Sequence, residues 1–136
     1  MITLKFRAIL DELPQMMEFV RSEINKIKFT SSDAKKCEIA IEEALVNIIR
    51  YAYPEGAGDV EISIARSGCK EIFFTIKDQG IAVNPLDHLK EYDTEAEIEK
   101  RPIGGLGLFF MDKILDKIEY QRERESNILN LRKSSK

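Results

Sequence analysis

Two polar residues on one predicted helix could take part in phosphoryl transfer. Glu43 and Asn47 lie four positions apart in the segment 37–49, whose small and apolar residues recur at three- and four-residue steps. This spacing predicts a helix with both side chains on one flank. A carboxylate there can accept a proton from a nucleophile, and an amide oxygen can ligate Mg²⁺, which prefers oxygen ligands. A core helix with two solvated polar residues would give the same pattern.

A second candidate stretch follows a predicted strand. Asp78 and Gly80 come directly after the alternating apolar and polar residues 72–77. A carboxylate in this position can accept a hydrogen bond from an exocyclic amine such as that of adenine. A glycine lets a flat ring approach the backbone closely and allows positive φ. An ordinary turn after a strand would use the same residues.

The third stretch is rich in glycine and precedes a predicted helix. It reads Gly104-Gly105-Leu106-Gly107-Leu108. Free backbone N–H groups at a helix N-terminus can bind phosphate with help from the helix dipole, although a hinge or helix cap has the same composition. Two familiar nucleotide motifs are excluded. No Lys-Ser/Thr pair follows the glycines as in a P-loop, and Phe110 stands where a dinucleotide fingerprint needs glycine or alanine.

Composition predicts one globular domain over residues 1–136, with 43% hydrophobic and 33% charged residues. A net charge of −3 without a basic stripe argues against nucleic-acid binding. No apolar run approaches the roughly 20 residues of a membrane span, and the N-terminus lacks a signal-peptide pattern. Cys37 and Cys69 have no metal-ligand spacing and are expected to be reduced thiols of a cytosolic protein. The single histidine, His88, is expected in a loop and excludes multi-histidine metal sites.

These stretches need a scaffold, and the residue pattern predicts one of class α+β. In order, we expect a strand at 2–6, a helix from about Asp11 to Ile27, a helix from the caps at 30–33 to about 51–53, strands near 60–64 and 72–77, a helix opening at Gly104, and strands near 118–122 and 127–132. Because strands occur mainly in adjacent pairs, the sheet should be mainly antiparallel, with helices on one face.

Three details of this scaffold are also predicted. The last two strands should be joined by a turn around Glu125-Ser126, and the tail Lys133–Lys136 should fray. Residues 84–102 are acidic and weakly patterned. A loop of this length is often a lid or binding segment, and a solvated insertion is an equally good interpretation.

The order and spacing of the three stretches resemble the gyrase and histidine-kinase-like (GHKL) ATPase superfamily. Within it, the chain is similar to the anti-sigma-factor serine kinases of bacterial switch systems. The similarity is closest in the segments 42–53 and 105–108, with Asp112 beyond them, and it extends from about residue 3 to 132. It implies the histidine-kinase-like ATPase (Bergerat) fold, in which helices cover one face of a mixed, mainly antiparallel sheet, and a lid at about 83–103.

The resemblance implies roles for the matching positions. Glu43 would be the general base and Asn47 the Mg²⁺ ligand, while Asp78 would bind the adenine amine above Gly80. The expected nucleotide-binding set is completed by Arg50, Ala82, Gly104, Gly105, Leu106, Gly107 and Leu108, and Lys100 and Arg101 are candidate lid cations. Arg50 could equally be a surface charge. Ala82 departs from the common Asp-x-Gly-x-Gly pattern, which implies a different path at the start of the lid.

The implied function is that of a cytoplasmic ATP- and Mg²⁺-dependent serine/threonine protein kinase and anti-sigma factor. It would phosphorylate an anti-sigma-antagonist (STAS-domain) protein, bind a sigma factor, form a homodimer and regulate transcription by partner switching. The alternative is an ATP-dependent protein-binding switch without phosphotransfer, which the presence of Glu43 disfavours. The catalytic half of a histidine kinase is disfavoured because no helical hairpin with a phosphoacceptor histidine is predicted. An α+β domain that binds no nucleotide would require three coincidentally ordered motifs.

Overall fold

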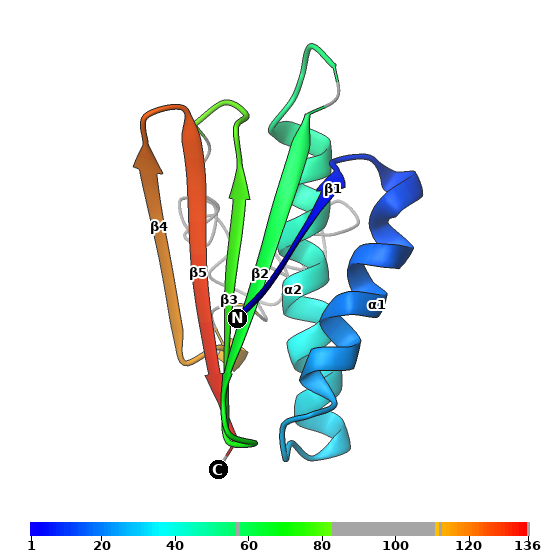
Figure 1. Cartoon of the computed structure of the whole chain (residues 1–136), viewed down its shortest axis with the longest axis vertical. Helices are drawn as coiled ribbons and strands as arrows, with labels where there is room; N and C mark the ends of the chain where they lie inside the picture. The colour runs from blue at the N-terminus through cyan, green and yellow to red at the C-terminus, as the bar shows by residue number, and fades with distance from the viewer. Residues whose placement is uncertain (57, 83–110, 112, 136) are drawn as a thin grey trace, which may run out of the picture.

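A five-stranded sheet forms one layer of the molecule, and helices form the other (Figure 1). The computed structural model describes residues 1–56, 58–82, 111 and 113–135. Its strands are β1 (Ile2–Arg7), β2 (Asp59–Ser67), β3 (Glu71–Asp78), β4 (Lys117–Glu123) and β5 (Ser126–Ser134), in the spatial order β1-β2-β3-β5-β4. Every neighbouring pair is antiparallel. The predicted α+β class and antiparallel sheet are confirmed.

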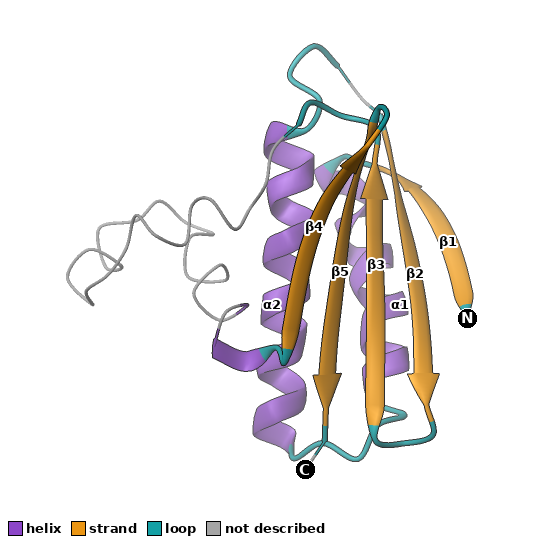
Figure 2. Ribbon diagram, turned by 90° about the vertical axis from the view of Figure 1, so that its left-hand side faces the viewer, coloured by secondary structure: helices purple, strands orange, loops and turns teal. Residues whose placement is uncertain are grey.

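Two helices, α1 (Leu13–Ile24) and α2 (Ser31–Tyr51), cover the same face of the sheet (Figure 2). A 3-10 turn, η1 (Leu10–Glu12), precedes α1, so the α-helix starts later than predicted, and it also ends before Ile27. The predicted capping of α2 is confirmed, because the Thr30 side chain accepts a hydrogen bond from the backbone N–H of Asp33 at 3.1 Å. Among the described helices, none has the length and apolarity to cross a membrane.

The core lies between the sheet and the helices because each contributes one apolar face. On β2 and β3 every second residue is buried, and on α2 the buried residues follow the helical repeat. Met111 and Leu115 pack into the same core from the end of the predicted third helix. Cys37 is fully buried in it as a free thiol, and burial raises the pKa of that thiol to about 12.

The C-terminal hairpin differs from the prediction in two places. Glu123 pairs with Ser126, so the turn is made by Arg124 and Glu125, with Arg124 at a φ of 57°. The expected fraying of the tail is wrong for Lys133 and Ser134, which belong to β5 and pair with β3. The strand continues because β3 offers partners as far as its first residue, which sequence periodicity alone does not reveal.

Candidate functional site

The helix α2 holds the first pair of candidate residues. Glu43 is buried, with 6% of its surface exposed, whereas Asn47 one turn later is half-buried and Arg50 is exposed. The apolar stripe of α2 packs in the core. This packing fixes the rotation of the helix about its axis, so the flank with Glu43 and Asn47 lies at the border of the core. The pair is therefore mounted on a rigid element, as a catalytic pair requires.

Asp78 is the last residue of β3, and its carboxylate is fixed by the backbone that follows. The side chain is 4% exposed, and its Oδ1 accepts a hydrogen bond from the N–H of Gly80 at 2.8 Å. The next residue, Ile81, donates its N–H to the carbonyl of Ala52 at 2.9 Å. Asp78 is thereby held beside the C-terminal end of α2.

Gly80 is required for packing in this structure. A Cβ on Gly80 would lie 2.2 Å from the carbonyl oxygen and 2.6 Å from the carbonyl carbon of Ala52. Its φ is not positive, unlike the φ of Gly56 and Gly68. The absence of a side chain therefore lets β3 end directly against α2, and the conformational freedom of glycine is not used here.

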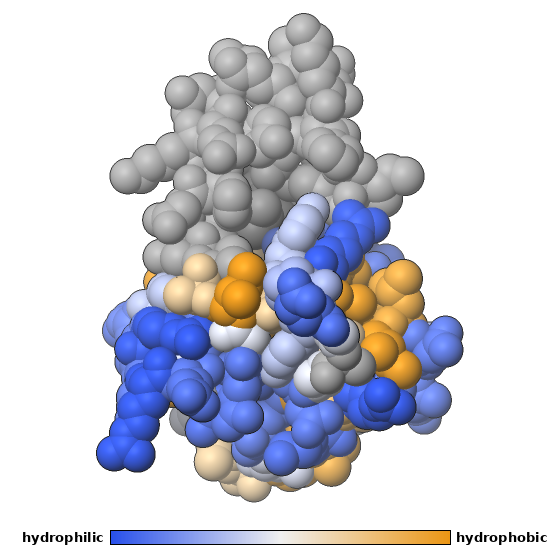
Figure 3. Space-filling model, turned by 90° about the horizontal axis from the view of Figure 1, so that it is seen from above, coloured by the Kyte–Doolittle hydropathy of each residue, from blue (hydrophilic) through white to orange (hydrophobic). Residues whose placement is uncertain are grey.

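This contact joins the two candidate stretches at one end of the molecule. Asn47 lies five residues before Ala52, and Glu43 lies nine residues before Ala52. These separations correspond to about 8 Å and about 14 Å along the helix axis. A ligand that starts at Asp78 and runs along α2 would therefore pass Asn47 before it reaches Glu43. Figure 3 shows the molecule from this end, where the described surface is mostly hydrophilic.

Tyr53 fastens the loop after α2 to the same end of the sheet. Its hydroxyl donates to the carbonyl of Asp59 at 2.6 Å and accepts the N–H of Gln79 at 2.8 Å. The ring packs over Gly58, where a Cβ would lie 2.1 Å from Cε1 of Tyr53. Burial raises the pKa of the Tyr53 phenol, so the hydroxyl remains protonated and able to donate.

Sequence analysis missed Asn127, which contacts Asp78 from the neighbouring strand. Asn127 is 5% exposed and lies directly opposite Asp78 in the β3–β5 register. Its Nδ2 donates to Oδ1 of Asp78 at 2.9 Å and to the carbonyl of Ile81 at 2.7 Å. A signal was present in the alternation of Asn127 with Leu129 and Leu131, which assigns a polar residue to the buried face of a strand.

Two further residues of the β4–β5 hairpin complete this network. Tyr120 donates its hydroxyl to Oδ1 of Asn127, and Arg122 donates from one guanidinium nitrogen to the same oxygen at 3.2 Å. That nitrogen of Arg122 also donates to the carbonyl of Gly80 at 2.7 Å. The hairpin therefore holds both the side chain of Asp78 and the backbone that follows it.

Several predicted site residues lie outside the described residues. They are the glycine-rich residues Gly104, Gly105, Leu106, Gly107 and Leu108, the cations Lys100 and Arg101, His88, Asp112 and the lid 83–103. Ala82 is described and exposed. Within the described part of the chain, no group of three or more His, Cys, Asp or Glu side chains could hold a metal ion.

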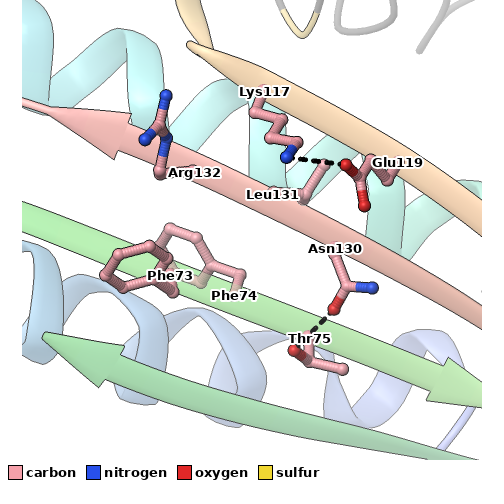
Figure 4. A pocket seen from close by; sticks show the side chains of 8 residues that line it. All are labelled: Phe73, Phe74, Thr75, Lys117, Glu119, Asn130, Leu131 and Arg132. Carbon is pink, nitrogen blue, oxygen red and sulfur yellow. Dashed lines mark hydrogen bonds and ion pairs between the residues drawn. The ribbon is translucent and has the colours of Figure 1, made fainter.

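A separate depression of about 320 Å³ lies on the sheet (Figure 4). It is lined by Phe73, Phe74, Thr75, Lys117, Glu119, Asn130, Leu131 and Arg132. The paired residues Phe73 and Arg132 lie on the opposite face of the sheet from their buried neighbours Phe74 and Leu131. The depression therefore opens away from the helices and is distinct from the Glu43–Asp78 region.

Comparisons with known proteins agree with this fold. The model of the family described as histidine kinase-like ATPase domain matches residues 6–133. A serine-protein kinase RsbW of Bacillus mycoides is 28% identical over 92% of this chain and 84% of its own length. The protein of the same name from Bacillus thuringiensis (strain Al Hakam) is 28% identical over 77% of this chain and 67% of its own length.

Two solved structures share the architecture. The histidine kinase domain of a blue-light activated histidine kinase from Erythrobacter litoralis EL346 has a TM-score of 0.56 at 16% identity, over 90% of this chain and 60% of that one. The mycobacterial sensor histidine kinase MprB has a TM-score of 0.51 at 18% identity, over 96% and 97% of the two chains. At these identities the likeness concerns the fold.

Proposed function

The chain belongs to the family of histidine kinase-like ATPase domains, and on that premise we propose that it is an ATP-dependent serine protein kinase that acts as an anti-sigma factor. Its substrate would be a serine of an anti-sigma-antagonist protein with a STAS domain. A sigma factor would be the second partner, the active form a homodimer, and the location the cytoplasm. We infer that residues 1–136 act as one ATP-binding unit, with 83–103 as the lid.

One observation carries this proposal. Glu43 and Asn47 share one flank of α2, and the C-terminal end of that helix contacts the segment that holds Asp78. A nucleotide base at Asp78 would direct its phosphates along α2 toward an amide and then a carboxylate. The likeness to proteins named serine-protein kinase, over 92% of this chain in one case, supports protein serine as the acceptor.

The adenine base would be recognised through hydrogen bonds. Among the described residues, the hydrogen bonds to the Asp78 carboxylate end on Oδ1, which leaves Oδ2 to accept the exocyclic amine of adenine. We assign Gly80 and Ala82 to the base-binding segment and Arg50 to a phosphate or partner contact. Gly104–Leu108 would wrap the phosphates, with Lys100 or Arg101 as the cation near the γ-phosphate.

The residues present fit a magnesium ion that is bound together with nucleotide. Mg²⁺ usually takes one or two protein oxygens and completes its shell with phosphate oxygens and water. The amide oxygen of the half-buried Asn47 offers one such ligand, and we propose that it holds the ion. When bound, Mg²⁺ would neutralise charge on the phosphates during transfer.

Glu43 would act on the incoming serine. As the serine oxygen bonds to the γ-phosphorus, the bond from that phosphorus to the bridging oxygen of ADP breaks, and the hydroxyl proton passes to the Glu43 carboxylate. The burial of Glu43 keeps bulk water away from this carboxylate. The product phosphoserine carries almost two negative charges, which would weaken the kinase–antagonist complex by repulsion.

The test combines binding and transfer measurements on the whole chain. We expect saturable binding of Mg²⁺-ATP by calorimetry, and transfer of labelled phosphate from ATP to a serine of a STAS-domain protein. Glu43→Ala should keep ATP binding and lose transfer, because the carboxylate serves the nucleophile. Glu42→Ala is the matched control, since Glu42 is exposed on the same helix.

The outcomes separate the competing functions. Absence of saturation at millimolar ATP and Mg²⁺ would exclude a nucleotide-binding role. Binding without transfer by the parent chain would indicate an ATP-dependent protein-binding switch. Equal transfer by the Glu43→Ala variant and the parent would remove Glu43 from the mechanism.

A further inference from the structure

The β4–β5 hairpin meets the nucleotide end of the site through a saturated polar network. Asn127 uses both N–H groups of its amide, on Asp78 and on the Ile81 carbonyl, and its oxygen accepts from Tyr120 and Arg122. The orientation of the amide follows from chemistry, because a guanidinium can only donate and a carbonyl can only accept. A rotated amide would face both groups with the wrong atom.

This network determines which oxygen of Asp78 a ligand can meet. Oδ1 already accepts two hydrogen bonds, from the N–H of Gly80 and from Nδ2 of Asn127. With Oδ1 occupied on two sides, the carboxylate cannot rotate freely, and no hydrogen bond from a described residue reaches Oδ2, which is therefore the acceptor left for a ligand. Both side chains are almost fully buried, at 4% and 5% exposure, so water competes weakly for these bonds.

The same network fixes the backbone that leaves β3. The carbonyl of Gly80 accepts from Arg122 at 2.7 Å, and the carbonyl of Ile81 accepts from Asn127 at 2.7 Å. Consecutive carbonyls held by two side chains of one hairpin give this segment a defined course up to Ile81. The hairpin therefore positions both the Asp78 carboxylate and the backbone that follows it.

We propose that Asn127, supported by Arg122 and Tyr120, is a positioning residue that makes the site selective for 6-aminopurine over 6-oxopurine nucleotides. A carboxylate oxygen fixed as an acceptor attracts the amine at position 6 of adenine and repels the carbonyl at position 6 of hypoxanthine or guanine. This inference rests on the proposed function, because it assumes that the nucleotide base lies at Asp78.

The experiment compares ATP with inosine triphosphate, which differs at position 6 of the base. Calorimetric dissociation constants are measured for both nucleotides with the parent chain, Asn127→Ala and Asn130→Ala. Asn130 is a matched control on the same strand: it accepts a hydrogen bond from Thr75 of β3 at 2.8 Å, on the opposite face of the sheet. We expect Asn127→Ala to weaken ATP binding about tenfold, the effect of roughly one lost hydrogen bond to a charged group.

Selectivity is the decisive quantity, because a purely structural role would not change it. The preference for ATP over inosine triphosphate should fall about tenfold in Asn127→Ala and stay at the parent value in Asn130→Ala. An unchanged ratio of the two dissociation constants in Asn127→Ala, whether or not both affinities fall, would overturn the inference. If the parent binds neither nucleotide, it is the proposed function that fails.

A second variant covers the case in which Asn127→Ala does not fold. Arg122→Met changes an exposed residue and removes the hydrogen bonds to Asn127 and to the Gly80 carbonyl. Because Arg122 is exposed and packs into no core position, the variant should remain folded, with the loss of stability expected for two hydrogen bonds, and its ATP preference should fall by about threefold to tenfold. A folded Arg122→Met protein with the parent preference would refute the role of the hairpin.

Discussion

Replacement of Gly80 by alanine tests the contact that joins the two parts of the site. The new Cβ would lie 2.2 Å from the oxygen, 2.6 Å from the carbonyl carbon and 2.6 Å from the Cβ of Ala52. Two of these atoms are backbone at the end of α2, so no flexible side chain can move aside. Relief of the clash requires the segment at Gly80 to move away from the helix.

The expected cost follows from two contributions. Overpacking of this kind costs about 1–3 kcal/mol. The hydrogen bond from Ile81 to the Ala52 carbonyl, 2.9 Å long, would be broken by the movement, at a cost of about 1 kcal/mol. The free energy of unfolding should therefore fall by about 2–4 kcal/mol, which for a chain of this size lowers the melting temperature by roughly 6–12 °C.

Calorimetric melting of the purified variant measures this effect, and Gly68→Ala is the informative control. Gly68 has a φ of 59°, and beyond Gly68 and its two chain neighbours no atom of the described residues lies within 4 Å of the position that a Cβ would take there. Its substitution therefore adds only left-handed backbone strain, about 1–2 kcal/mol. A Gly80→Ala protein that melts within about 2 °C of the parent would contradict the packing argument.

Three further predictions address other parts of the molecule. Burial raises the pKa of Cys37 from 9.0 to about 12, so between these pH values the unfolded chain loses a proton that the folded chain keeps, and stability should fall with a slope that approaches about 1.4 kcal/mol per pH unit. Urea unfolding between pH 9 and 10, below the range in which the Tyr53 phenol titrates, should show this fall, and Cys37→Ala should lack it. Tyr53→Phe removes the hydroxyl that joins Asp59 to Gln79 and should lower the free energy of unfolding by about 1–2 kcal/mol. Urea unfolding at neutral pH measures this change, and an unchanged free energy of unfolding would show that the two hydrogen bonds do not stabilise the fold. Asp78→Asn replaces a carboxylate oxygen by an N–H donor and should weaken ATP binding by about tenfold to a hundredfold in calorimetry. Unchanged affinity would show that Asp78 does not contact the adenine base.

Much of the fold could be predicted because its signals are local. Alternation at Val60, Ile62 and Ile64 predicted a half-buried strand, and the candidate caps at 30–33 predicted the start of α2, among which the structure uses Thr30. The tail was harder, because Lys133 and Ser134 have no strand pattern of their own. They join β5 because β3 lies beside them and pairs with them as far as its first residue, Glu71.

The sequence by itself determined the relation between Glu43 and Asn47, because the helical repeat alone puts residues four apart on one flank. Only the tertiary structure decided the surroundings of Asp78. Asn127 is 49 residues away in the chain and meets it through strand register, and the need for glycine at position 80 comes from the end of α2. Pairing between distant segments depends on how the whole core packs, and no local pattern encodes it.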